Sequence, residues 1–82
     1  MKFKLNHLYR IITPSDDSYQ YDVIARYIGR DNYGNPEFND VYILNDKVQN
    51  KNLVKNWSIT EVELKDYKIT EIIEEEYPEY FI

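Results

Sequence analysis

The residues with the clearest chemical potential are the glutamates near the C-terminus, in the stretch ITEIIEEEYPEYFI. Five carboxylates lie there among isoleucine and aromatic side chains: Glu71, Glu74, Glu75, Glu76 and Glu79. Carboxylates at this density could serve as general acids and bases, bind a cation, or present a negative surface to a basic partner. The rest of the sequence discriminates among these three uses.

Catalysis has little support in the sequence. His7 is the only histidine and there is no cysteine, so no serine has an evident partner for a nucleophilic triad. Acid–base catalysis by two carboxyl groups needs a cleft that drives their pKa values apart. A chain of 82 residues offers little room for such a cleft, and we therefore predict that the protein is not an enzyme.

Signatures of cofactors and metals are also missing from the sequence. Two loops rich in oxygen ligands, DNYGN and NDKVQNKN, lack the fixed spacing of a calcium loop, and there is no Cys/His set for zinc. The only glycines are Gly29 and Gly34, which rules out a glycine-rich phosphate loop. We expect no cofactor and no metal.

The charge is distributed unevenly along the chain, which has a net charge of −5. Residues 1–60 hold eight basic and seven acidic side chains, whereas residues 61–82 hold two basic and eight acidic ones. Such an acidic end attracts basic surfaces and repels nucleic acid and anionic membranes at long range. The N-terminal residues contain no apolar run suited to a signal peptide or membrane span. Together with the missing cysteines, this predicts a cytoplasmic protein.

The elements that would position these side chains are predicted to be strands. HLYRIIT, YQYDVIARYIGR and FNDVYIL each read as a strand, and the loop GRDNYGNPE suits a hairpin between the second and third. Alternate residues of the second strand form one aromatic and apolar face: Tyr19, Tyr21, Val23, Ala25 and Tyr27. In the third strand, alternation places Phe38 and Tyr42 on one face and Ile43 on the other. The segment WSITEVEL predicts a fourth strand, with a bulge or bend near Thr60.

A helix is predicted at the end of the chain. Ile69, Ile72, Ile73 and Tyr77 follow the spacing of an amphipathic helix, and Pro78 would end it. The predicted fold is therefore one mainly β domain over residues 1–82. Residues 1–64 would form a small antiparallel barrel or a strongly curved sheet of four or five strands, and residues 65–82 an acidic C-terminal helix and tail.

The strand spacing of residues 5–64 resembles that of SH3-like barrels. YDVIARYIG and FNDVYILND would form the central hairpin, and WSITEVEL a later strand. The resemblance implies a small barrel, an architecture that carries many different functions. The composition is rich in Asn, Lys, Ile and Tyr, with Ala25 as the only alanine. It resembles that of small acidic accessory proteins of phages and mobile elements.

The first functional hypothesis is a phage-like interaction module that either only binds, or binds and inhibits, a host protein through a basic surface of that protein. A protein that handles nucleic acid is one such target, since a dense row of carboxylates imitates the charge of DNA. Aromatic side chains at the rim would add contacts. The predicted partner-binding residues are Glu71, Glu74, Glu75, Glu76, Glu79, Tyr77, Tyr80 and Phe81. The same face could also be only the solvated exterior of a helix.

An alternative hypothesis is a small barrel that binds single-stranded nucleic acid, because bases stack on aromatic side chains. Its predicted site comprises Tyr19, Tyr21, Tyr27, Tyr42, Trp57 and Arg26. These aromatic residues are equally suited to fill a core that contains few leucines. A further alternative is a phage assembly or accessory subunit whose partner is a virion protein or a second copy of the chain.

Overall fold

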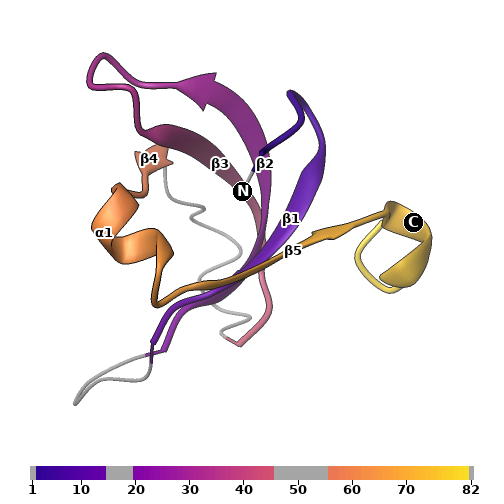
Figure 1. The fold of residues 1–82 in the computed structure, drawn as a ribbon. Helices are drawn as coiled ribbons and strands as arrows, with labels where there is room; N and C mark the ends of the chain where they lie inside the picture. The colour runs from indigo at the N-terminus through magenta and orange to yellow at the C-terminus, as the bar shows by residue number, and fades with distance from the viewer. Residues whose placement is uncertain (1, 15–19, 46–55, 82) are drawn as a thin grey trace.

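The structure, a computed structural model, describes residues 2–14, 20–45 and 56–81 (Figure 1). These residues form a five-stranded antiparallel sheet with strand order β4-β3-β2-β1-β5. The elements are β1 (Leu8–Ile12), β2 (Asp22–Arg30), β3 (Pro36–Ile43), β4 (Trp57–Ser58), α1 (Glu61–Leu64), β5 (Lys68–Ile72) and a 3-10 turn, η2 (Glu74–Glu76). The prediction of a mainly β fold is confirmed. No helix within the described ranges is long and apolar enough to cross a membrane.

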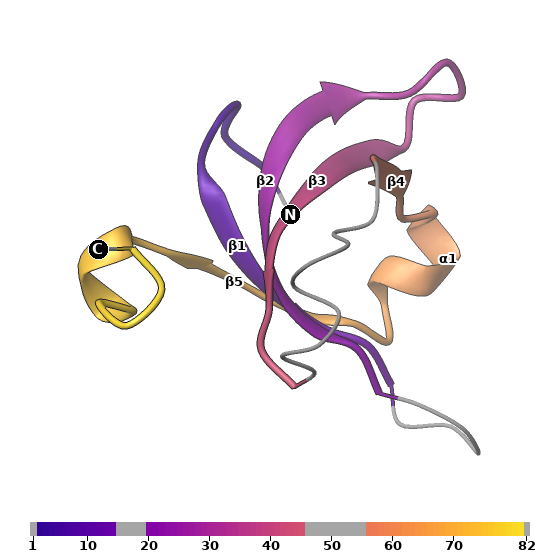
Figure 2. The same ribbon diagram turned by 180° about the vertical axis from the view of Figure 1, so that it is seen from behind.

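The sheet is strongly curved but open. Its edges are β4 and β5, and within the described ranges no ladder joins them. Figures 1 and 2 show α1 beside β4 at one end of the sheet, with the C-terminal residues beyond β5 at the other end. The structure therefore supports a curved five-stranded sheet, and barrel closure is not observed.

The hairpin of β2 and β3 forms the centre of the sheet, as predicted. The connection is a tight turn in which Asp31 Oδ1 accepts hydrogen bonds from the backbone N–H groups of Tyr33 and Asn35, each at 2.9 Å. Gly34 adopts a φ of 83° in this turn, a conformation that costs glycine little because it lacks a Cβ atom. The glycine, aspartate and asparagine residues of this loop thus predicted the hairpin turn correctly.

The sheet carries a separate apolar cluster on each face. The first, here called the large core, contains Tyr9, Ile11, Val23, Ala25, Tyr27, Phe38, Ile43 and Ile59. The second, the small core, contains Leu8, Ile24 and Ile72. Tyr21, Val23, Ala25 and Tyr27 all contribute to the large core, so the predicted face of β2 is confirmed for these residues. Tyr19 lies outside the described residues.

A β-bulge in β3 changes the predicted alternation. The register pairs Ile24 with Tyr42 but Ala25 with Asp40, which leaves Val41 as an extra residue. A bulge shifts the parity of the residues that follow it. As a result, Ile43 joins the large core and Tyr42 packs on the small core, so the predicted shared face of Phe38 and Tyr42 is wrong.

The predicted fourth strand is largely replaced by a short helix. β4 spans only Trp57–Ser58, and Thr60 then caps α1. Thr60 Oγ1 accepts a hydrogen bond from the Glu63 N–H at 3.3 Å, while Glu63 Oε1 accepts one from the Thr60 N–H at 3.0 Å. This reciprocal pair is a capping box. Its signature, Thr followed three positions later by Glu, was present in the sequence.

The helix predicted over Ile69–Tyr77 is wrong. Residues Lys68–Ile72 form β5, which pairs antiparallel with β1 through Ile69↔Ile11 and Ile72↔Leu8. Isoleucines three apart have opposite parity on a strand, and here they enter the two different cores. Since β1 offers an apolar edge with a core on each side, strand pairing buries Ile72 and half-buries Ile69. The helical structure that follows in the described part of the chain is a single 3-10 turn, at Glu74–Glu76.

Candidate protein-binding surface

The C-terminal segment, residues 73–81, is attached to the sheet by its aromatic side chains. Tyr77 and Phe81 pack against the small core. The rings of Tyr80 and Phe81 lie 5.2 Å and 5.3 Å from the ring of Tyr42, measured between centroids. These three aromatic residues, predicted as anchors for a partner, therefore hold the segment on its own sheet.

Four glutamates of this segment face solvent. They are called here the acidic segment and comprise Glu74, Glu75, Glu76 and Glu79, all of them exposed. Glu76 Oε1 accepts a hydrogen bond from the Ile73 N–H at 2.9 Å, which fixes the start of the turn. In the part of the chain that the structure describes, the ion pairs involve none of these four carboxylates.

Glu71 differs from the four glutamates of the acidic segment because it contacts basic side chains. It is located on β5, where its carboxylate contacts His7 Nδ1 at 3.0 Å and Lys4 Nζ at 3.7 Å. The hydrogen bond with His7, aided by the charge of Lys4, lowers the pKa of the Glu71 carboxyl group. Glu71 therefore has basic neighbours within its own chain and offers less uncompensated charge to a partner than the acidic segment does.

Arg10 approaches the C-terminal segment, but its charge is already paired. Its Nη1 donates to the Tyr77 hydroxyl at 3.5 Å. Its Nε and Nη2 donate to the two carboxylate oxygens of Asp22 at 3.0 Å and 2.8 Å. This bidentate pair holds the pKa of the Arg10 guanidinium above its usual value. The guanidinium thus positions Tyr77 without neutralising the acidic segment.

The four aromatic residues of the nucleic-acid hypothesis that the structure describes, Tyr21, Tyr27, Tyr42 and Trp57, do not form one accessible platform. Tyr27 is only 8% exposed, and Tyr21 and Trp57 pack against the large core. Tyr42 lies on the other face, against the C-terminal segment. Base stacking requires accessible ring faces, and most of these rings are already packed against protein. Arg26, for its part, donates to the backbone oxygen of Asn6 at 2.7 Å.

A buried carboxylate, Asp40, was not singled out by the sequence. It is 5% exposed and accepts hydrogen bonds from the Tyr21 hydroxyl at 2.6 Å and from Trp57 Nε1 at 2.5 Å. Burial raises its pKa, and the two hydrogen bonds oppose that shift. The contacts connect β3 to β4 and to the start of β2. An acidic residue between apolar positions of a strand was the available signal.

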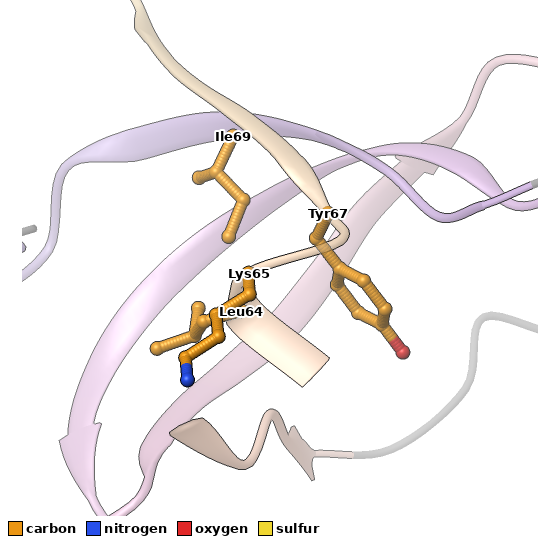
Figure 3. Close-up of a pocket in the computed structure, with 4 residues that line it drawn as sticks. All are labelled: Leu64, Lys65, Tyr67 and Ile69. Atoms are coloured by element: carbon orange, nitrogen blue, oxygen red, sulfur yellow. The ribbon is translucent and has the colours of Figure 1, made fainter. Parts of the chain in front are cut away.

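A pocket of about 320 Å³ lies at the rim of the large core and is lined by Leu64, Lys65, Tyr67 and Ile69 (Figure 3). Figure 3 shows Ile69 pointing toward Leu64, while the Tyr67 ring points away from both. The Tyr67 hydroxyl donates to Glu63 Oε2 at 3.1 Å. The described lining is largely apolar with one ammonium group. Burial raises the pKa of the Tyr67 hydroxyl, so its contact with Glu63 does not activate it as a nucleophile.

Neither metal-ligand geometry nor similarity to known proteins assigns a function to the chain. Among the residues in the described ranges, no group of three or more metal-ligating side chains is suitably placed to hold an ion. No protein-family model matches the chain, and no curated protein or solved structure matches it.

Proposed function

We propose that the protein is a non-enzymatic interaction module whose acidic segment binds a basic surface on another protein. The single observation that carries this proposal is that the aromatic and the acidic side chains of residues 73–81 point in different directions. The aromatic side chains pack on the sheet, while the four carboxylates are exposed and have no ion-pair partner among the described residues. A negative surface held in this way favours fast, salt-sensitive association with basic partners.

Anchoring makes this segment better suited to recognition than a free acidic tail. A partner that binds an ordered segment does not need to offset the entropy of ordering it. The carboxylates also repel one another, which is a small cost that a solubilising surface of mixed charge would avoid. Binding of a basic partner would relieve this repulsion, and a host protein that handles nucleic acid would present the required lysines and arginines.

The origin and the location of the protein belong to the same proposal. A phage-like accessory protein that acts in the cytoplasm of a bacterial host fits the composition described above. The resemblance to SH3-like barrels over residues 5–64 concerns architecture alone, and the curved antiparallel sheet supports it. No observation in the described residues favours binding of single-stranded nucleic acid or a role as an assembly subunit over this function.

The proposal is tested by charge reversal at two positions of the acidic segment. Glu74→Lys/Glu75→Lys alters exposed residues whose side chains make no described contact and leaves the Glu76 cap intact. The tagged double variant and the wild-type chain are used to capture proteins from a bacterial lysate at about 50 mM and 500 mM salt, the range over which screening becomes strong. Wild-type protein is expected to retain a basic partner at low salt only, and the variant to lose it.

A matched control carries the same change of charge elsewhere. Glu61→Lys/Asp66→Lys reverses two exposed residues, the first residue of α1 and a residue just after it, at the opposite end of the sheet (Figure 1). This control should retain the partner, and both double variants should unfold at nearly the wild-type temperature. Equal loss in both variants would reduce the effect to net charge. Capture that ignores salt and both substitutions would refute the proposed function.

A further inference from the structure

We infer that the outer edge of β5 binds an extended basic segment of the partner as an added antiparallel strand. This inference rests on the proposed function and names the mode of binding. Edge strands present unpaired N–H and C=O groups, and peptides recognise them by main-chain hydrogen bonds. The described strands leave two such edges, β4 and β5.

Of these two edges, β5 is the more suitable template. It spans five residues, whereas β4 spans two. Its pairing with β1 is in continuous register from Lys68 to Ile72, and the strand contains neither proline nor glycine. Bulges and prolines are devices that natural proteins use to block pairing at an edge. Their absence from β5 leaves a regular edge about 17 Å long.

The structure also defines where this edge stops. Ile73 is extended, with φ −122° and ψ 156°, but both of its backbone groups are already occupied by Glu76. Its N–H donates to Glu76 Oε1 and its oxygen accepts from the Glu76 N–H. The available edge therefore ends at Ile72, while the Ile73 side chain remains 55% exposed as an apolar contact beside it.

Charge complementarity identifies the occupant. A strand that pairs antiparallel with β5 would begin beside Ile72, so the residues that precede it would reach the acidic segment at Glu74 and Glu75. Lysines or arginines there would meet carboxylates that have no ion pair among the described residues. At the other end of β5, Lys68 is exposed and disfavours a basic residue. The expected ligand is thus a segment with basic residues first and β-branched residues after them.

The test uses a defined probe, the peptide acetyl-KKTVTVT-amide, with the full chain observed by NMR at low salt. A fully N-methylated form of the peptide is the control, because it keeps every side chain and charge but donates no backbone hydrogen bond. The unmethylated peptide should slow amide exchange at alternate residues of β5. It should also bind at least about tenfold more tightly than the control, the equivalent of one or two net hydrogen bonds.

The outcomes separate this inference from the proposed function. Equal binding of both peptides, with shifts confined to residues 73–81, would overturn strand addition and leave the electrostatic function standing. Absence of binding would also overturn the inference, and the capture experiment with Glu74→Lys/Glu75→Lys would still decide the function independently. A dimer whose β5 amides are protected before peptide is added would overturn it in favour of pairing between two copies.

Discussion

The two faces of the sheet are covered in different ways. The large core contains eight buried residues drawn from three strands and from Ile59, whereas the small core contains three: Leu8, Ile24 and Ile72. The large core is further closed by residues of α1 and β5, including Leu64 and Ile69. The small core is instead covered by the C-terminal segment, which carries the exposed acidic residues.

This difference separates the residues that stabilise the domain from those that position the proposed binding surface. Free energy from burial scales with the apolar area removed from water, so the large core supplies most of it. Burial in the small core contributes less free energy. The small core instead fixes the position of the acidic segment, because Tyr77 and Phe81 pack against it. Changes on the first face should unfold the whole domain, and changes on the second should release the acidic segment while the sheet persists.

The largest effect is expected for Phe38→Ala. Phe38 is fully buried in the large core and its ring lies 5.2–6.2 Å from the rings of Phe3, Tyr9, Tyr27 and Trp57. Removing it should cost about 3–5 kcal/mol, a large part of the stability of a small domain. Urea unfolding followed by circular dichroism measures this loss, and a loss below about 1 kcal/mol would contradict the importance assigned to this face.

A smaller effect is expected for Phe81→Ala on the other face. Phe81 is half-buried against the small core and Tyr42, so its removal should cost about 1–2 kcal/mol. Amide exchange should accelerate across residues 73–81 and remain slow in β2 and β3. Uniform acceleration throughout the sheet would show that the two faces form a single cooperative unit.

Asp40→Asn should change stability by roughly 1 kcal/mol, the size of one hydrogen bond, in a pH-dependent manner. The native pKa of Asp40 is raised by burial, so the native state binds its proton more readily than the unfolded state does. Wild-type stability contributed by this group is therefore greatest at low pH and falls as pH rises through the raised pKa.

Asparagine keeps an acceptor for Trp57 Nε1 and cannot ionise. The stability of Asp40→Asn relative to wild type should therefore increase from about pH 3.5 to pH 7, a range that starts below the ordinary pKa of Asp. Thermal unfolding across this range provides the measurement. A difference that does not vary with pH would contradict a raised pKa at Asp40.

The smallest effect is expected for Glu71→Gln, at the end of β5 that leads to the C-terminal segment. The pKa of Glu71 is lowered, chiefly by its hydrogen bond with His7. Its contribution is therefore present above the ordinary pKa of Glu and is lost as pH falls through the lowered value. Exposed ion pairs contribute little, so unfolding temperatures near pH 7 should be almost unchanged. A pronounced loss would show that this contact secures β5 to the N-terminal residues.

The success of the sequence-based predictions varied with the range of the interactions involved. Alternate residues from Tyr21 to Tyr27 are aromatic or apolar, and the prediction that they share one face of the sheet was confirmed. The spacing of the isoleucines at positions 69, 72 and 73 fits a helix and a strand equally well, and the helix predicted from this spacing was wrong. The capping-box residues Thr60 and Glu63 were a local signal for the start of a helix, but the alternating residues around them favoured a strand.

The candidate site shows the same limit. Its glutamates were identifiable because four of them lie within six residues of one another and depend on no other part of the chain. The roles of Tyr77, Tyr80 and Phe81 were assigned to a partner, although these side chains pack on the chain's own sheet. The local sequence is the same whether such an aromatic residue contacts a partner or packs on its own sheet. The contact of Tyr80 with Tyr42 spans more than thirty positions, so the neighbouring residues do not reveal it.

The sequence by itself determined the β class, the central hairpin and the concentration of negative charge at the C-terminus, because alternation, turn chemistry and net charge are local properties. Only the tertiary structure decided that residues 68–72 pair with β1, that Val41 is a bulge, and that aromatic residues fasten the acidic segment to the sheet. Each of these outcomes depends on which apolar surfaces distant parts of the chain leave uncovered, and burial of those surfaces outweighs the weak local preferences.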